Sequence, residues 1–441
     1  MTWAVLAALV LFLVAAPAVA EEPSWRLADY GLKGQLIYKN FTYFSETSTD
    51  PQKVVDEGIF QLEWARRWGA WGSSKLVVEA RGDDIGFTRG LTFQIPETAL
   101  RRSYLAVKES TFAVRGGPLE VTLGKQIFAW GAADANNPTD RINPYDYLDP
   151  FDNEKMGLWS AAARLTVGPA SLVFVTVPFF TPSRLPLARS RWIPEAPPGF
   201  NAVVDHPVRP DQDAGATQYA ARLRTTVAGW DVSVSYYDGF AHTPAFRQSV
   251  IAVAPGVFLP RLTPVFTREK DAGLDFSTTI GRFEIHSEGV FRFVVSNGRD
   301  DRFQGIAGIN YTQDVGLRWL DQIVLVLEYA RETVLRHIRH SGIIDNQNAP
   351  LIGALLADEA FRDAVVGRIQ VKLTEDTVLK LSGIADLSGP PSHYIQFKAT
   401  HRITDALHVE AGLDFMTGTR DTFFGRWGDN DRFFLMLRYL F

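Results

Sequence analysis

The sequence has 441 residues, a formal net charge of -5 at pH 7 and no cysteine. The lack of cysteine excludes disulfides, thiolate zinc sites and thiol catalysis, and the slight acidic excess gives no reason to expect nucleic acid as a partner. No Pro/Gly-rich or low-complexity stretch separates two unlike halves, so one large domain is the simpler expectation.

The chain begins with an apolar run, AVLAALVLFLVAAP at residues 4–17, which is followed by Ala18-Val19-Ala20 and two glutamates. This order is typical of a secretory signal with an A-x-A cleavage site. We therefore expect a signal peptide over residues 1–20 and a mature domain over residues 21–441, although no Lys or Arg precedes the run. An uncleaved anchor is the alternative, but the run is shorter than the roughly 20 residues that span a bilayer.

Strands are the main element that the sequence predicts, because apolar and polar residues alternate with a period of two over most of the mature chain. In WDVSVSY at residues 230–236, aromatic and aliphatic residues alternate with Asp and Ser. We predict an all-β chain that forms a single transmembrane antiparallel β-barrel of about 18 strands, with 16 as the alternative. The strands are expected near residues 32–41, 58–66, 74–82, 101–114, 119–128, 158–167, 171–178, 217–227, 230–237, 271–280, 283–293, 303–312, 320–330, 364–373, 377–386, 393–401, 406–415 and 432–441.

The connections between these strands alternate in length. Short turns such as RGGP at 115–118 and GR at 281–282 alternate with long segments such as 179–216 and 238–270. Around an antiparallel sheet this places the short turns at one end and the long loops at the other, as in bacterial outer-membrane barrels. A soluble periplasmic protein is the alternative, but the continuous apolar face of the strands favours contact with lipid. We predict location in the bacterial outer membrane.

Aromatic residues are expected to form the two girdles that such barrels carry at the membrane interfaces. Trp71, Trp230 and Trp319 lie at predicted periplasmic turns, and Trp130 and Trp427 lie near predicted outer strand ends. Scattered core tryptophans are the alternative explanation.

The third external loop, residues 129–157, is the most distinctive segment. Two Asn-Pro pairs and one Asp-Pro pair favour rigid turns, and six acids against two bases give a local charge of -4. In general porins the third loop folds inward and narrows the channel, and by this resemblance we expect residues 129–157 to form the constriction. A compact, solvated external loop, with a calcium-like cation, is the alternative. The charged residues of the loop are Asp134, Asp140, Arg141, Asp146, Asp149, Asp152, Glu154 and Lys155.

A set of basic residues falls on the predicted lumen face of the strands, where it could oppose this acidic loop. Facing acid and base sets create a transverse field that orders water and selects polar solutes. For each basic residue, an ion pair with a lumen carboxylate is at least as good an interpretation as contact with a solute. The set consists of Arg222, Arg224, Arg368, Lys372, Lys380 and Lys398.

The chain ends on an amphipathic strand in which Leu437, Tyr439 and Phe441 share one face. A terminal Phe after alternating hydrophobic residues resembles the assembly signal of Gram-negative outer-membrane barrels, and this resemblance implies recognition by the barrel-assembly machinery. The Gly-Lys-Gln, Trp-Gly and Asn-Pro pattern of residues 124–147 also resembles a poorly characterised group of large barrels, some of them related to polysaccharide-export porins.

These features predict a porin-like channel for the passive passage of small polar or anionic solutes, without enzymatic activity or a cofactor. About ten residues precede the first strand of the mature chain, so no N-terminal plug domain is expected. His337 and His340 have a metal-ligand spacing, but flanking arginines favour contact with lipopolysaccharide phosphates or solvation. The alternatives are passage of hydrophobic compounds, export of a polymer, and an adhesive barrel. Outer-membrane lipid is an expected partner, and the oligomeric state stays open.

Overall fold

The computed structural model describes residues 30–193, 202–254, 257–295, 300–336, 343–344 and 361–441. The expected signal peptide, residues 1–20, and the pair of His337 and His340 lie outside these ranges. Within them, no helix is both long and apolar enough to cross a membrane.

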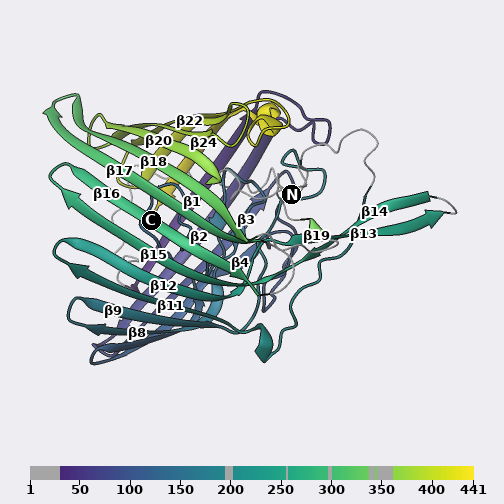
Figure 1. Ribbon diagram of the computed structural model, residues 1–441. Helices are drawn as coiled ribbons and strands as arrows, with labels where there is room; N and C mark the ends of the chain where they lie inside the picture. The colour runs from purple at the N-terminus through teal and green to yellow at the C-terminus, as the bar shows by residue number, and fades with distance from the viewer. Residues whose placement is uncertain (1–29, 194–201, 255–256, 296–299, 337–342, 345–360) are drawn as a thin grey trace.

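An antiparallel sheet of 18 strands closes into a barrel, which Figure 1 shows from the side. The first strand pairs with the last, from Gln35 opposite Leu440 to Tyr43 opposite Arg432. Closure leaves no unpaired edge, which a sheet in lipid requires. The barrel strands are β1 Leu32–Tyr43, β2 Val54–Trp68, β3 Gly72–Asp83, β4 Leu105–Gly116, β5 Leu119–Gln126, β8 Leu158–Val167, β9 Ala170–Val177, β11 Gln218–Val227, β12 Trp230–Phe240, β15 Arg268–Ile280, β16 Phe283–Val294, β17 Asp301–Leu317, β18 Leu320–Arg336, β20 Asp363–Lys372, β21 Thr377–Asp386, β22 Ser392–Arg402, β23 Leu407–Thr417 and β24 Arg432–Leu440.

The predicted barrel of 18 strands is confirmed, and the differences concern strand length. β17 and β18 have 17 residues each, whereas the sequence pattern predicted about ten. β18 continues over residues 331–336 toward the external loops, whereas β17 gains residues 313–317 toward the short turn at 318–319, and at both ends the alternation of apolar residues fades. A pattern based on lipid contact therefore underestimates strands that extend beyond the membrane.

The last residue, Phe441, extends the pairing of β1 with β24 by one position at the seam where the barrel closes. Phe441 exchanges two backbone hydrogen bonds with Gly34, with N···O distances of 2.8 and 3.0 Å. Its ring covers the Cα of Gly34, where an added Cβ would come within 2.3 Å of the ring carbons. The ring also stacks on Phe60 with centroids 6.1 Å apart. The terminal Phe therefore fills the space that a glycine leaves on the lipid face of the seam.

The external loops carry a second sheet that the sequence reading missed. It has four strands in the order β10-β14-β13-β19, and its long hairpin extends away from the barrel in Figure 1. The run 238–270 was expected to be a loop because it lies between two barrel strands, although residues 249–260 contain no charged side chain. The remaining elements are β6 Tyr145–Asp146, β7 Glu154–Lys155, β10 Val203–Val204, β13 Ala245–Ala254, β14 Val257–Val265, β19 Ile343–Ile344, and the short 3-10 helices η2 Ala214–Ala216 and η5 Gly425–Asn430.

The expected outer aromatic girdle is wrong for two of its members. Trp130 and Trp427 are buried, whereas Trp71 and Trp319, at the opposite end, expose more than half of their surface. Trp427 packs in an apolar cluster inside the barrel mouth, where external loops meet the inner faces of strands near the seam. That cluster consists of Phe41, Tyr43, Val55, Phe87, Leu148, Trp192, Met416, Phe423, Phe424, Trp427 and Phe434.

Candidate functional site

The loop of residues 127–157 joins β5 to β8 and makes contacts far around the barrel wall. In one direction it reaches β18, eight strands from β5 in a barrel of 18. In the other direction it reaches β24, five strands from β5. A segment that contacts both of these walls must cross the interior, because its contacts are with side chains that point into the barrel.

Two glutamates on the far wall accept the backbone of the loop. Glu288 on β16 accepts N–H groups from Ala132 and Thr139 at 2.7 and 3.0 Å. Glu328 on β18 accepts N–H groups from Asp134 and Ala135 at 2.7 and 3.0 Å. Hydrogen bonds to a buried carboxylate are among the stronger kinds. The two glutamates, which we call the latch, therefore hold the tip of the loop against the wall opposite its origin.

Arg141 extends the far contact to the neighbouring strand β15. Its Nη2 lies 3.0 Å from Glu269 and its Nε lies 3.2 Å from Asp271, and both carboxylates are buried. Arg292 on β16 lies 3.2 Å from the same Asp271. The predicted constriction residue Arg141 is therefore a bridge to the wall.

On the near side, the loop acids pair with basic residues of β1, β3, β4 and β24, of other external segments and of the loop itself. Asp146 is fully buried between Arg102, at 2.9 Å, and Arg184, at 2.8 Å. Asp149 forms an ion pair with Arg432 of β24. The other near-side pairs are Asp140 with Lys155 within the loop, Asp152 with Lys39 of β1, and Glu154 with Arg81 of β3 and Lys108 of β4.

These environments change the proton affinity of the loop carboxyls. Burial raises the pKa of Asp146, but the charges of Arg102 and Arg184 outweigh it and hold the pKa well below its usual range. Burial likewise opposes the charges of Lys108 and Arg81 at Glu154, whose pKa falls to about 2. For Asp140 burial prevails over its lysine partner, so the pKa is raised.

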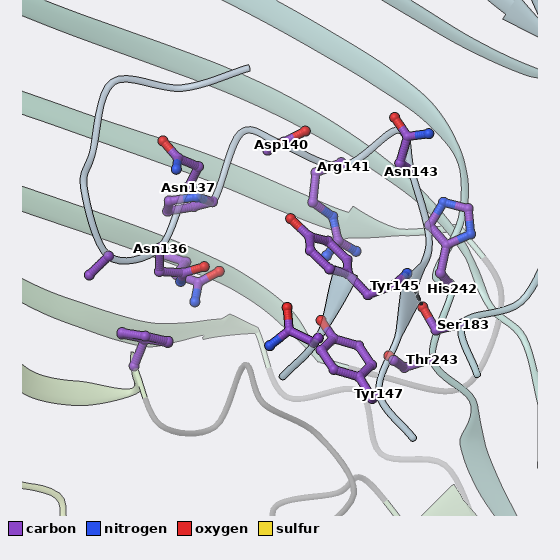
Figure 2. Close-up of a pocket in the computed structure, with 15 residues that line it drawn as sticks. Asn136, Asn137, Asp140, Arg141, Asn143, Tyr145, Tyr147, Ser183, His242 and Thr243 are labelled. Carbon is purple, nitrogen blue, oxygen red and sulfur yellow. Dashed lines mark hydrogen bonds between the residues drawn. The ribbon is translucent and has the colours of Figure 1, made fainter. Parts of the chain in front are cut away.

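A polar cavity of about 200 Å³ lies between the loop and other external segments. Figure 2 shows Tyr145 and Tyr147 of the loop stacked beside Ser183 and Thr243, with rings 5.4 Å apart. At its edge, the ring nitrogens of His242 lie 2.8 and 3.0 Å from the carbonyl oxygens of Thr181 and Ile142. Burial lowers the pKa of His242 to about 4, so the ring is neutral at pH 7.

The predicted basic set does not lie together but is spread over four places on the barrel wall. Arg368 of β20 contacts the loop directly, with its Nη2 2.8 Å from Asp134. Arg222 binds Asp275 of the wall at 2.9 Å. Arg224 and Lys372 pair with Asp231 and Asp321 nearer the turns opposite the loops. Lys380 and Lys398 lie on β21 and β22 and face each other in register.

Several residues that hold the loop were missed by the sequence reading. The latch glutamates fall on the predicted lumen face, but nothing in the pattern distinguishes them from other polar lumen residues. His242, Arg81 and Arg102 lie in or beside segments expected to be loops or strand ends. The position of the latch glutamates as charged residues in the middle of a predicted lumen face is the available signal, but Asp275 and Arg292 share it, so it does not single them out.

One group of side chains has the composition of a metal site. Ligand atoms of Asp134, His286 and Glu328 lie within 4.8 Å of one another. His286 Nε2 lies 2.7 Å from Glu328, which also accepts the loop backbone, and Asp134 is bound by Arg368 and Asn310. The hydrogen bonds already present account for this cluster. An outer-membrane hydrolase could use His286, His401 and His408, but His401 and His408 lie on β22 and β23, far from His286 on β16, so these histidines do not form one catalytic set.

The fold is similar to that of solved outer-membrane channels. OccD3 (OpdP) of Pseudomonas aeruginosa matches with a TM-score of 0.53 and 8% identity, over 93% of this chain and 91% of that chain. OccK11 (OpdR) of the same organism matches with a TM-score of 0.50 and 11% identity, over 93% and 95%. No protein-family model matches the chain, and no curated protein matches its sequence. The chain therefore has a porin-like fold, a closed antiparallel β-barrel of 18 strands.

Proposed function

We propose that this barrel is a channel for passive passage of small polar or anionic solutes, and that loop 127–157 forms its constriction. The observation that carries the proposal is the latch, because Glu288 and Glu328 hold the loop backbone against the wall opposite its origin. A loop that crosses the barrel and is held at opposite walls reduces the area through which a solute can pass. The loop then acts as a rigid filter, since its acidic side chains are already paired with basic residues of the wall, of other external segments and of the loop itself.

Passage of hydrophobic compounds, the second candidate, has less support. It would use the inward apolar residues Val290, Val324, Val326, Phe434, Met436 and Leu440. Val290, Val326 and Phe434 are buried, with at most 7% of their surface exposed, whereas Leu440 is 37% exposed. Phe434 belongs to the apolar cluster at the barrel mouth, so it is unavailable as part of a continuous apolar path. Neither candidate requires catalysis, and we propose that the protein is not an enzyme.

Single-channel recording tests the proposal. Residues 21–441, refolded and inserted into planar bilayers, are expected to give ohmic current steps. Replacing both latch residues, Glu288→Ala and Glu328→Ala, is expected to increase conductance and current noise as the loop leaves the wall. Glu284→Ala is the matched control, because it removes the same charge from β16 without a contact to the loop backbone. A folded barrel that conducts nothing would contradict the channel function.

We further propose that lipopolysaccharide surrounds the barrel and that the barrel-assembly machinery recognises the terminal strand. Before closure, the β24 edge with Leu437, Tyr439 and Phe441 is free to pair with another chain. In the closed barrel this edge is occupied by β1. Phe441→Ala is expected to reduce the yield of assembled barrel in cells while the purified chain still refolds in detergent.

A further inference from the structure

The lumen wall formed by β20, β21 and β22 carries two lysines that oppose each other. Lys380 and Lys398 are directly paired positions of neighbouring strands and project from the same face. Like charges directly opposite on a sheet repel each other and destabilise the pair. Such an arrangement needs compensating negative charge close by, from the protein or from solution.

The protein supplies this charge to one lysine only. Lys398 Nζ lies 3.2 Å from Glu410 of β23. Within the described ranges, Lys380 has no ion pair and no side-chain hydrogen bond. The charged groups around it are Lys398, Arg368, Glu410 and Asp134. Asp134 is already bound by Arg368 and Asn310, so no carboxylate is left for Lys380.

The neighbours of Lys380 can donate hydrogen bonds. Gln370 of β20 is its register partner on the other side, and Ser382 follows two residues later on the same face of β21. The site borders one loop contact, since Ser382 is the register partner of Arg368, and it extends from there toward the short turns. Phe151 of the loop packs on Tyr394 with ring centroids 4.8 Å apart, and Lys398 lies four residues, or about 13 Å, further along β22 toward the turn at 403–406.

We propose that Lys380 and Lys398, with Gln370 and Ser382 beside them, form a binding site for the oxyanion groups, carboxylate or phosphate, of small anionic solutes that have passed the loop. Two ammonium groups and a hydroxyl match the several acceptor oxygens of such groups. This inference rests on the proposed channel function, because a solute reaches the site through the lumen. It makes the solute class anionic, and it places the selecting charges on the wall instead of the loop.

Citrate, a tricarboxylate, is a suitable probe. In planar bilayers it is expected to interrupt the current of the wild-type channel. Lys380→Gln is expected to weaken this block about tenfold, because one charged hydrogen bond to the probe is lost. Lys372→Gln is the matched control, because it removes the same charge from the neighbouring strand β20, where the lysine is paired with Asp321 at 2.6 Å. Lys380→Arg is expected to keep most of the block.

The outcomes separate the site from the channel. Ohmic currents without citrate block, or an equal loss in Lys380→Gln and Lys372→Gln, would overturn the site and leave the channel function standing. If the wild type conducts nothing, calorimetric titration of the detergent-solubilised barrel with citrate decides the site independently. Binding lost in Lys380→Gln but retained in Lys372→Gln would then support it, and absence of binding in the wild type would refute it.

Discussion

Two charged surfaces inside the barrel differ in how their charges are neutralised. On loop 127–157, Asp146 is fully buried between two guanidinium groups, and its neighbours along the loop are also paired. On the β20–β22 wall, Lys380 faces Lys398 without a carboxylate of its own. Charges that pair within the protein stabilise it, whereas a charge without a partner can act on a solute. In the proposed channel, the acidic loop would therefore serve as the constriction, and the basic wall is the better candidate for selecting ions.

The comparison is tested most strongly at Asp146. Asp146→Asn removes the carboxylate that Arg102 and Arg184 share and leaves each with one remaining partner, Glu57 and Glu97. Removal of one partner from a buried ion pair costs about 3–5 kcal/mol. We expect a loss of about 3 kcal/mol in the free energy of unfolding, measured by urea titration in detergent. Asp321→Asn, which breaks an exposed pair, is the control. An effect of similar size in both variants would contradict the assignment of Asp146 as a structural charge.

Lowering the pH is expected to destabilise the same region, because His242 becomes protonated. Its pKa of about 4 in the folded protein lies below the ordinary value of 6.5, so the unfolded chain binds the proton more tightly. The neutral ring therefore contributes to the free energy of unfolding above pH 6.5. This contribution, of up to about 3 kcal/mol, is lost as the pH falls toward 4.

The measurement is the free energy of unfolding at pH 7 and pH 4.5 for the wild type and for His242→Gln. Gln cannot titrate, so the variant should be less stable than the wild type at pH 7 and should lose less stability on acidification. Arg141 is the charged group that opposes protonation of this ring, and it stays charged over the whole range. Equal pH slopes in both proteins would rule out His242 as the source.

The latch offers a smaller and more local test. Glu288→Gln keeps an acceptor oxygen but removes the charge, which weakens its hydrogen bonds to the loop by about 2 kcal/mol. Faster amide hydrogen exchange is expected at Ala132, Ala133 and Thr139, whose N–H groups or side chains contact this carboxylate. Glu284→Gln should leave these rates unchanged, and unchanged rates in Glu288→Gln would show that the loop does not depend on the latch.

The smallest effect is expected for the exposed pair of Arg224 and Asp231. The two side chains expose 57% and 38% of their surface, and exposed ion pairs contribute about 0–1 kcal/mol. Arg224→Gln should change the free energy of unfolding by less than about 0.5 kcal/mol and should leave the citrate block intact. A large change in the free energy of unfolding or in the citrate block would instead support Arg224 as a constriction residue.

The sequence by itself determined the barrel. A period of two fixes which side chains face lipid, and the alternation of short and long connections fixes the antiparallel order, so 18 strands and closure by the last strand were predictable. These properties are local, because each depends on residues adjacent in the chain. Even Lys380 and Lys398 could be placed on the lumen face in this way.

Only the tertiary structure decided which charges meet. Asp146 pairs with Arg102, 44 residues earlier, and Glu288 accepts the backbone of residue 132, 156 residues earlier. Such contacts depend on how far the barrel curves and on the path of the loop across it, and neither leaves a periodic signal. The same holds for the buried Trp130 and Trp427, because an aromatic residue near a strand end can turn toward lipid or toward a loop with equal ease.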